Sequence, residues 1–122
     1  MIADNLIYKD VCYELDSLGS ACSERQYQDA LEFKLNAMRV NFEREKDLLF
    51  KLKEGSIAGN RADFVVDDKV VIDLKAKKEI SRDDFKQMLR YLRAGEYKLG
   101  LIVNFGSSKV ITQRVINANI RI

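Results

Sequence analysis

The chain has 122 residues, of which 47% are hydrophobic and 33% are charged, and its formal net charge at pH 7 is +2. This composition is typical of a single globular domain over residues 1–122, not of a disordered or membrane-spanning chain, and so small a charge does not by itself indicate a nucleic-acid partner. The sequence has no histidine and no Cys-x-x-Cys pair, which excludes Ser-His-Asp and Cys-His catalysis and a zinc site.

Two amphipathic helices are predicted in the first third of the chain. Residues 4–18 carry apolar side chains at helical intervals and should form an N-terminal helical extension. A second helix is expected from about residue 23 to residue 38, with Tyr27 on its apolar stripe. Glu24 lies three residues before Tyr27, so we expect its side chain at the end of that stripe rather than on the solvent face.

Strands are predicted from residue 40 onwards, where the hydrophobic period changes towards two. The segments VNFEREKDLLFKL and SIAGNRADFVV are interpreted as strands joined across Glu54-Gly55, with a bulge at Gly59. A third strand, KVVIDLKAK, follows a turn at Asp67-Asp68.

The last third of the chain should contain one helix and one or two strands. The segment ISRDDFKQMLRYLRAG begins with a capping box formed by Ser81 and Asp84, and Gly95 closes it. The short apolar run YKLGLIVNFG suits a buried strand, and the alternating residues of ITQRVINANIRI suit another. This order predicts an α/β fold in which helices flank a small mixed sheet.

The third predicted strand carries a charged pair within an apolar run. Since residues i and i+2 of a strand share a face, Asp73 and Lys75 lie on the side of Val71. A face that is apolar at its start and charged at its end is typical of a strand that delivers a charged pair to a cleft. Taken alone, such a pair is more often a surface salt bridge worth under roughly 1 kcal/mol.

The loop before this strand decides whether Asp63, on the preceding strand, joins the pair. A three-residue loop over residues 67–69 sets Asp63 opposite Asp73 on one face. A two-residue loop pairs Asp63 with Ile72 instead and turns the two carboxylates to opposite faces. Like charges across a strand pair are destabilising, and a bound divalent cation reverses the sign of that interaction. Because two carboxylates and water suit Mg²⁺, the first register predicts a metal site.

Two further charged residues complete the candidate site. Lys75 is suited to hold an attacking water or to neutralise charge that develops on a phosphate. Glu24, on the helix that covers the sheet, is a further acidic ligand or a hydrogen-bond partner of one. The alternative is that Glu24 only stabilises the start of its helix. Together these residues predict metal-assisted hydrolysis of phosphodiesters.

Four segments of the chain resemble the small GxxExxY proteins of the PD-(D/E)xK nuclease superfamily. They are SERQYQDAL, RADFVVDDKVVIDLKA, QMLRYL and LGLIVNFG, and the similarity extends over about residues 18–117. The resemblance implies a restriction-endonuclease-like αβββαβ core, whose metal site is formed by a helix glutamate, a strand aspartate and the (D/E)xK pair. It assigns these roles to Glu24, Asp63, Asp73 and Lys75.

The resemblance also assigns supporting residues. Tyr27 matches the tyrosine of the name motif, and Gln87 and Tyr91 match a Gln-x-x-x-Tyr motif that related nucleases place beside the active site. Two positions depart from the pattern, since Ala21 replaces the glycine of the name motif and Asp73 replaces the more frequent glutamate. Both acids occur at the latter position in the superfamily, so we expect metal binding to be retained.

One flank of the last predicted helix carries a basic stripe. Its members are spaced at helical intervals: Arg82, Lys86, Arg90 and Arg93. Such a stripe can follow a nucleic-acid backbone without reading bases, although a solvated helix face is the more common interpretation. Gln87 also has two interpretations, because it suits a phosphate or a metal-bound water and is equally typical of an exposed polar flank.

We therefore expect a cytoplasmic, Mg²⁺-dependent nuclease, with Mn²⁺ as a substitute, that hydrolyses phosphodiester bonds of nucleic acid, foremost DNA. Asp63, Asp73 and Glu24 are expected to bind the metal ion, and Lys75 to assist attack by water. The alternative is a catalytically silent module of the same fold that binds nucleic acid or protein. In a third interpretation, the alternating residues 115–122 leave a strand edge open to a second copy, which gives a homodimer.

Overall fold

The computed structural model describes residues 5–15, 22–107 and 109–119. Its centre is a five-stranded sheet. The strands are β1 (Phe42–Asp47), β4 (Arg61–Val66), β5 (Val70–Lys75), β6 (Leu99–Asn104) and β7 (Ile111–Ile116). They lie in the order β1-β4-β5-β6-β7. β5 and β6 run parallel to each other and the other neighbours are antiparallel, so the sheet is mixed, as predicted.

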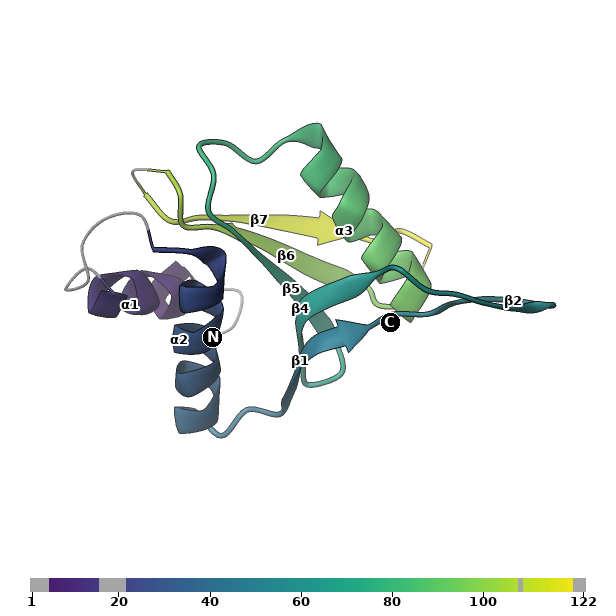
Figure 1. Cartoon of the computed structure of the whole chain (residues 1–122), viewed down its shortest axis with the longest axis horizontal. Coiled ribbons are helices and arrows are strands. Elements are labelled where there is room, and N and C mark those ends of the chain that lie inside the picture. Colours follow the sequence, from purple (N-terminus) through teal and green to yellow (C-terminus); the bar gives the residue numbers. More distant parts are fainter. Residues whose placement is uncertain (1–4, 16–21, 108, 120–122) are drawn as a thin grey trace.

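Helices cover both faces of the sheet (Figure 1). α1 (Asn5–Leu15) and α2 (Glu24–Ala37) pack on one face, and α3 (Arg82–Gly95) packs on the other. α3 connects the parallel strands β5 and β6, which require a crossover of this kind. None of the described helices has the length and apolarity that a membrane span requires. Residues 16–18 of the predicted N-terminal helix, and Ala21, lie outside the described residues.

Local sequence signals set the limits of the helices. Ser23 caps α2 and Ser81 caps α3, each with a capping box, and the second box is completed by Asp84 as predicted. Gly95 is the last residue of α3. The left-handed conformation that follows the helix is adopted by Glu96, with φ of 59°.

A hairpin interrupts the two strands predicted between residues 40 and 66. It consists of β2 (Phe50–Leu52) and β3 (Gly55–Ile57), and it extends away from the five-stranded sheet (Figure 1). Gly59, with φ of 107°, lies between β3 and β4 and not at a bulge within a strand. The period of two continues through the sheet strands and the hairpin alike, so it does not reveal where the chain leaves the sheet.

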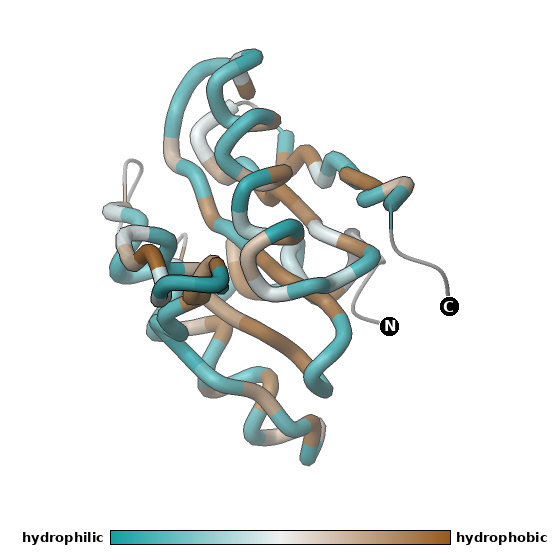
Figure 2. The backbone as a smooth tube through the Cα atoms, turned by 90° about the vertical axis from the view of Figure 1, so that its right-hand side faces the viewer, coloured by the Kyte–Doolittle hydropathy of each residue, from teal (hydrophilic) through white to brown (hydrophobic). Residues whose placement is uncertain are grey.

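The core forms two apolar layers, one on each face of the sheet. The layer beneath α1 and α2 contains Tyr8, Leu31, Leu35, Phe64, Ile72, Leu74 and Leu101. The layer beneath α3 contains Val65, Val71, Met88, Leu92 and Ile102. Figure 2 shows hydrophobic stretches running through the interior of the molecule between polar turns. Because β5 alternates between the two layers, its charged residues lie on the α3 face.

β7 is an edge strand of the sheet. Ile111 and Ile116 on this strand are 46% and 51% exposed. Such an edge is open to pairing with a second copy, and the homodimer stays a prediction. The end of the predicted strand, residues 120–122, lies outside the described part of the chain.

Candidate active site

The turn between β4 and β5 brings two aspartates face to face. Val66 pairs with Val70, so the loop consists of three residues, 67–69. The last paired residues are Phe64 and Ile72, and the same register continued by one residue sets Asp63 opposite Asp73; the two side chains are joined by a hydrogen bond. The first two loop residues, both aspartates, have φ of 55° and 52°, a conformation that aspartate tolerates better than most residues. Of the two loop lengths considered, the structure has the one that puts both carboxylates on the α3 face.

The Asp63 carboxyl group is held where its ionisation is unfavourable. The backbone N–H of Leu74 donates a hydrogen bond of 2.7 Å to Asp63 Oδ2. Burial raises the pKa of Asp63 to about 7, and the negative charge of Asp73 and a hydrogen bond with it act in the same direction. The Leu74 N–H and the Lys75 ammonium group act in the opposite direction without outweighing them. Near neutral pH the Asp63 carboxyl is thus partly protonated.

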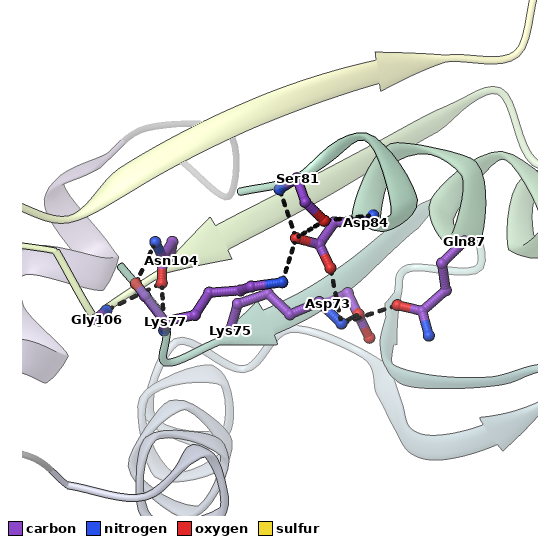
Figure 3. A network of polar contacts seen from close by, with 8 residues as sticks. All are labelled: Asp73, Lys75, Lys77, Ser81, Asp84, Gln87, Asn104 and Gly106. Carbon is purple, nitrogen blue, oxygen red and sulfur yellow. Dashed lines mark hydrogen bonds and ion pairs between the residues drawn. The ribbon is translucent and has the colours of Figure 1, made fainter. Parts of the chain in front are cut away.

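Lys75 lies at the centre of the polar contacts on this face (Figure 3). Its Nζ atom is 2.9 Å from Asp73 Oδ2 and donates a hydrogen bond of 2.8 Å to Gln87 Oε1. The same atom is 3.9 Å from Asp84 Oδ1. Burial alone would lower the pKa of Lys75, but the neighbouring carboxylates, Asp73 foremost, outweigh burial and raise it. The ammonium group therefore keeps its charge at neutral pH.

α3 directs three polar side chains towards this pair. Asp84, Gln87 and Tyr91 follow one another at intervals of three and four, so they share one face of the helix. Gln87 contacts Lys75 directly. Tyr91 is only 7% exposed, and burial together with the charge of Asp73 raises its pKa. The structure thus places both residues of the predicted Gln-x-x-x-Tyr motif beside the charged pair.

In the sequence, Asp84 is recognisable only as a helix cap, yet it is also part of this site. Its Oδ2 atom accepts hydrogen bonds from Lys77 Nζ at 2.8 Å, and from the Ser81 N–H at 2.8 Å and hydroxyl at 3.1 Å. Burial alone would raise the pKa of Asp84, but these hydrogen bonds outweigh burial and lower it. The available signal was its position one turn before Gln87 on the same helix face.

Glu24 and Tyr27 belong to α2, which packs on the opposite face of the sheet. Glu24 is exposed in the first turn of α2, so the prediction that its side chain lies off the solvent face is wrong, although its charge acts electrostatically on Lys75. Tyr27 is 7% exposed and stacks on Phe105, with 4.1 Å between ring centroids and 8° between ring planes. Within the described residues, no group of three or more acidic or cysteine side chains is placed to hold a metal ion. The structure therefore brings the two aspartates and the lysine together and leaves Glu24 outside this group.

The basic stripe lies on the outer side of α3. All four of its side chains are exposed: Arg82, Lys86, Arg90 and Arg93. The opposite side of the helix is buried, with Met88 and Leu92 in the core. The stripe is therefore accessible to a ligand, and its contact with nucleic acid stays a prediction.

A buried asparagine fastens the segment after β5 to the end of β6 (Figure 3). Asn104 Oδ1 accepts hydrogen bonds from the backbone N–H groups of Lys77 at 3.1 Å and Gly106 at 3.0 Å. Asn104 Nδ2 donates to the Lys77 carbonyl oxygen at 2.8 Å. Gly106 packs so closely that a Cβ atom added there would lie 2.2 Å from the backbone nitrogen of Lys77. Asn104 at the end of β6 and Gly106 in the turn that follows it therefore fix the backbone of Lys77.

Gly106→Ala is expected to lower the free energy of unfolding by about 1–3 kcal/mol, because the added methyl group must displace the Lys77 backbone from Asn104. Urea unfolding followed by circular dichroism measures the change. A free energy of unfolding equal to that of the wild type would contradict the close contact between these segments.

The fold is found in other solved structures. The crystal structure of SSO0001 matches with a TM-score of 0.62 and 20% sequence identity, covering 93% of this chain and 59% of that chain. The crystal structure of an alkaline exonuclease (LHK-Exo) from Laribacter hongkongensis matches with a TM-score of 0.54 and 13% identity, covering 94% of this chain and 69% of that chain. At these identities the likeness shows the fold, which is the predicted restriction-endonuclease-like α/β fold.

The sequence itself matches a protein family. Residues 5–115 match the PD-(D/E)XK nuclease superfamily, and this range contains β4, β5 and α3, which carry the candidate site. No curated protein is similar enough in sequence to match. The chain spans 59% of the length of SSO0001. Because the family match extends over nearly the whole sequence, the chain belongs to the PD-(D/E)XK nuclease superfamily.

Proposed function

We propose that the protein is a metal-dependent nuclease that hydrolyses phosphodiester bonds of nucleic acid. The observation that carries the proposal is the contact between the carboxyl groups of Asp63 and Asp73, next to the ammonium group of Lys75. Membership of a nuclease superfamily and the similar fold of an alkaline exonuclease support the same reaction class.

The two aspartates suit a divalent cation. Carboxylate oxygens are the ligands that Mg²⁺ and Mn²⁺ prefer, and Mg²⁺ usually keeps several waters, so two protein ligands suffice. Burial foremost, and repulsion by Asp73 after it, raise the pKa of Asp63, and a cation bound between the two carboxylates would relieve the repulsion. A metal ion held there would supply Lewis-acid stabilisation and an activated water. We propose Mg²⁺ as the natural ion.

Lys75 is proposed to stabilise the charge that develops on the scissile phosphate. Its raised pKa keeps it protonated, so it acts as a cation and not as a general base. The ammonium group has three protons, and its contacts with Asp73 and Gln87 use two of them. The third can be donated to a phosphate oxygen, with the group already oriented before substrate binds.

Finer assignments follow from the same arrangement. We propose that DNA is the substrate. We also propose that the chain belongs to the GxxExxY group. The stacking of Tyr27 on Phe105 supports this second assignment, because the two rings come from two of the segments that resemble that group. Glu24 is proposed to act at longer range, through water, since it is exposed and influences Lys75 electrostatically.

The proposal is tested with purified protein and labelled duplex, single-stranded and branched DNA and RNA. Cleavage is expected with Mg²⁺ or Mn²⁺ and none with a chelator. Calorimetric titration should show Mn²⁺ binding that Asp73→Asn weakens about tenfold or more, because one of two charged ligands is lost. Asp83→Asn, the same change at an acidic residue in the first turn of α3, should bind Mn²⁺ like the wild type.

A second candidate is a binding module without catalytic activity. It is favoured by the absence of a three-ligand metal site among the described residues. Such a module gives no reason for Mn²⁺ to bind at the aspartate pair. Nucleic-acid binding without Mn²⁺ binding and without cleavage would therefore replace the nuclease proposal with this one.

A further inference from the structure

Lys77 is fixed in place although it lies beyond the end of β5. Both of its backbone polar groups bond to the side chain of Asn104, which is fully buried, and Gly106 packs directly against them. A surface lysine needs no such restraint to keep its charge hydrated, because its long side chain reaches water from most positions. The restraints hold the Cα atom of Lys77 at the end of the strand that carries Asp73 and Lys75.

Lys77 and Lys75 approach the same carboxylate (Figure 3). Lys77 Nζ lies 2.8 Å from Asp84 Oδ2, and Lys75 Nζ lies 3.9 Å from Asp84 Oδ1. The side chain of Lys77 is 41% exposed, whereas that of Lys75 is 16% exposed. The site therefore has two neighbouring cations, of which one is enclosed and the other is open to solvent.

The contact with Asp84 does not satisfy the Lys77 ammonium group. Asp84 Oδ2 also accepts two hydrogen bonds from Ser81, and the carboxylate carries one charge for two lysines. The ammonium group has three protons, and this contact uses one. Because the Lys77 side chain is 41% exposed and Asp84 also accepts hydrogen bonds from Ser81, stability alone is a weak reason for the geometry of this ion pair.

We propose that Lys77 binds a backbone phosphate of the nucleic acid, next to the phosphate that Lys75 faces. The inference takes its class of ligand from the proposed function, but it requires binding only and not cleavage. A cation on a fixed backbone holds the strand in position relative to the aspartates without reading its sequence. The competing interpretation, that Lys77 only supports the Asp84 cap, predicts an effect on stability and none on binding.

Fluorescence anisotropy of labelled single-stranded and duplex DNA, in chelator so that nothing is cleaved, measures this role. Between about 50 and 200 mM NaCl, Lys77→Gln is expected to reduce the slope of log Kd against log salt by about 0.7 for the single strand or 0.9 for the duplex. Its Kd should rise roughly tenfold at the lower salt concentration. Glutamine keeps a donor for Asp84, so the thermal unfolding temperature should stay close to that of the wild type.

Two variants serve as controls. Lys78→Gln removes the same charge from the adjacent exposed residue, and Lys77→Arg keeps the charge in place; both should retain the wild-type slope. An unchanged slope for Lys77→Gln, an equal loss for Lys78→Gln, or no DNA binding by the wild type would overturn the inference. A reduced slope in a protein that never cleaves would support it and refute the nuclease proposal. Cleavage by the wild type together with an unchanged slope for Lys77→Gln would support the nuclease proposal and overturn the inference about Lys77.

Discussion

Lys75→Met is expected to slow metal-dependent cleavage by about 10²–10³-fold, the loss found when one preorganised donor to a developing negative charge is removed. Methionine has a similar length and no charge, so the apolar stem of the side chain still fills its space. Single-turnover cleavage of labelled nucleic acid measures the chemical step separately from binding. Binding in chelator should change far less than the rate, because several exposed basic side chains of α3 remain.

The same substitution tests whether Lys75 is also needed to hold Asp73. Asp73 is 4% exposed and loses its nearest cation, which is expected to lower the free energy of unfolding by about 3 kcal/mol in the absence of metal. Lys75→Arg keeps the charge, so it should keep stability, while its planar donors fit the contacts with Asp73 and Gln87 poorly and leave an intermediate rate. Lys78→Met should behave like the wild type. A wild-type cleavage rate in Lys75→Met would remove Lys75 from the mechanism.

The sheet could be predicted from local pattern, and so could the two possible placements of Asp63 relative to Asp73, between which the loop length decides. The alternation of apolar residues in β4 and β5 fixes which side chains face α3, and the loop of residues 67–69 fixes the register. Once that register is set, Asp63 and Asp73 lie on one face whatever the helices do. The capping box at Ser81 is equally local, and it marks the start of α3 correctly.

The remaining parts of the site depend on how distant segments approach one another. The sequence pattern identifies Asp84 only as a helix cap. Its contacts with two lysines arise because the start of α3 lies over the end of β5. In the sequence, Asn104 is only the polar end of an apolar strand. Its hydrogen bonds to the Lys77 backbone depend on the packing of β6 beside the segment that contains Lys77. Glu24 was placed from helix periodicity, which gives its position on α2 but not the face of the sheet on which α2 packs.

The Asp63→Asn variant is expected to be more stable than the wild type above neutral pH. The folded-state pKa of Asp63 is raised from 3.8 to about 7, so folding favours the protonated acid. The contribution of the protonated Asp63 to the free energy of unfolding is fully present below pH 3.8 and is lost as the pH rises towards about 7. The loss in the free energy of unfolding is up to about 4 kcal/mol. Asparagine is neutral at every pH and keeps an oxygen that can accept the Leu74 N–H, so it avoids this loss.

Urea unfolding in chelator at several pH values between about 4 and 8 measures the difference. The wild type should lose stability relative to Asp63→Asn as the pH rises through this range. Asp84 has the opposite dependence, since its pKa is lowered and its contribution is lost only as the pH falls below the ordinary range of a carboxyl group. The comparison of the two proteins cancels that effect, because both contain Asp84.

A divalent cation should reverse the penalty in the wild type alone. At pH 8 the Asp63 carboxylate is ionised, and Mn²⁺ at about 100 times its Kd should restore about 2.7 kcal/mol of stability. Asp63→Asn lacks that charge and should gain much less. Parallel stability curves for the two proteins from acid to alkaline pH would show that the aspartates do not repel each other in the folded protein, and the reason to place a cation between them would be lost.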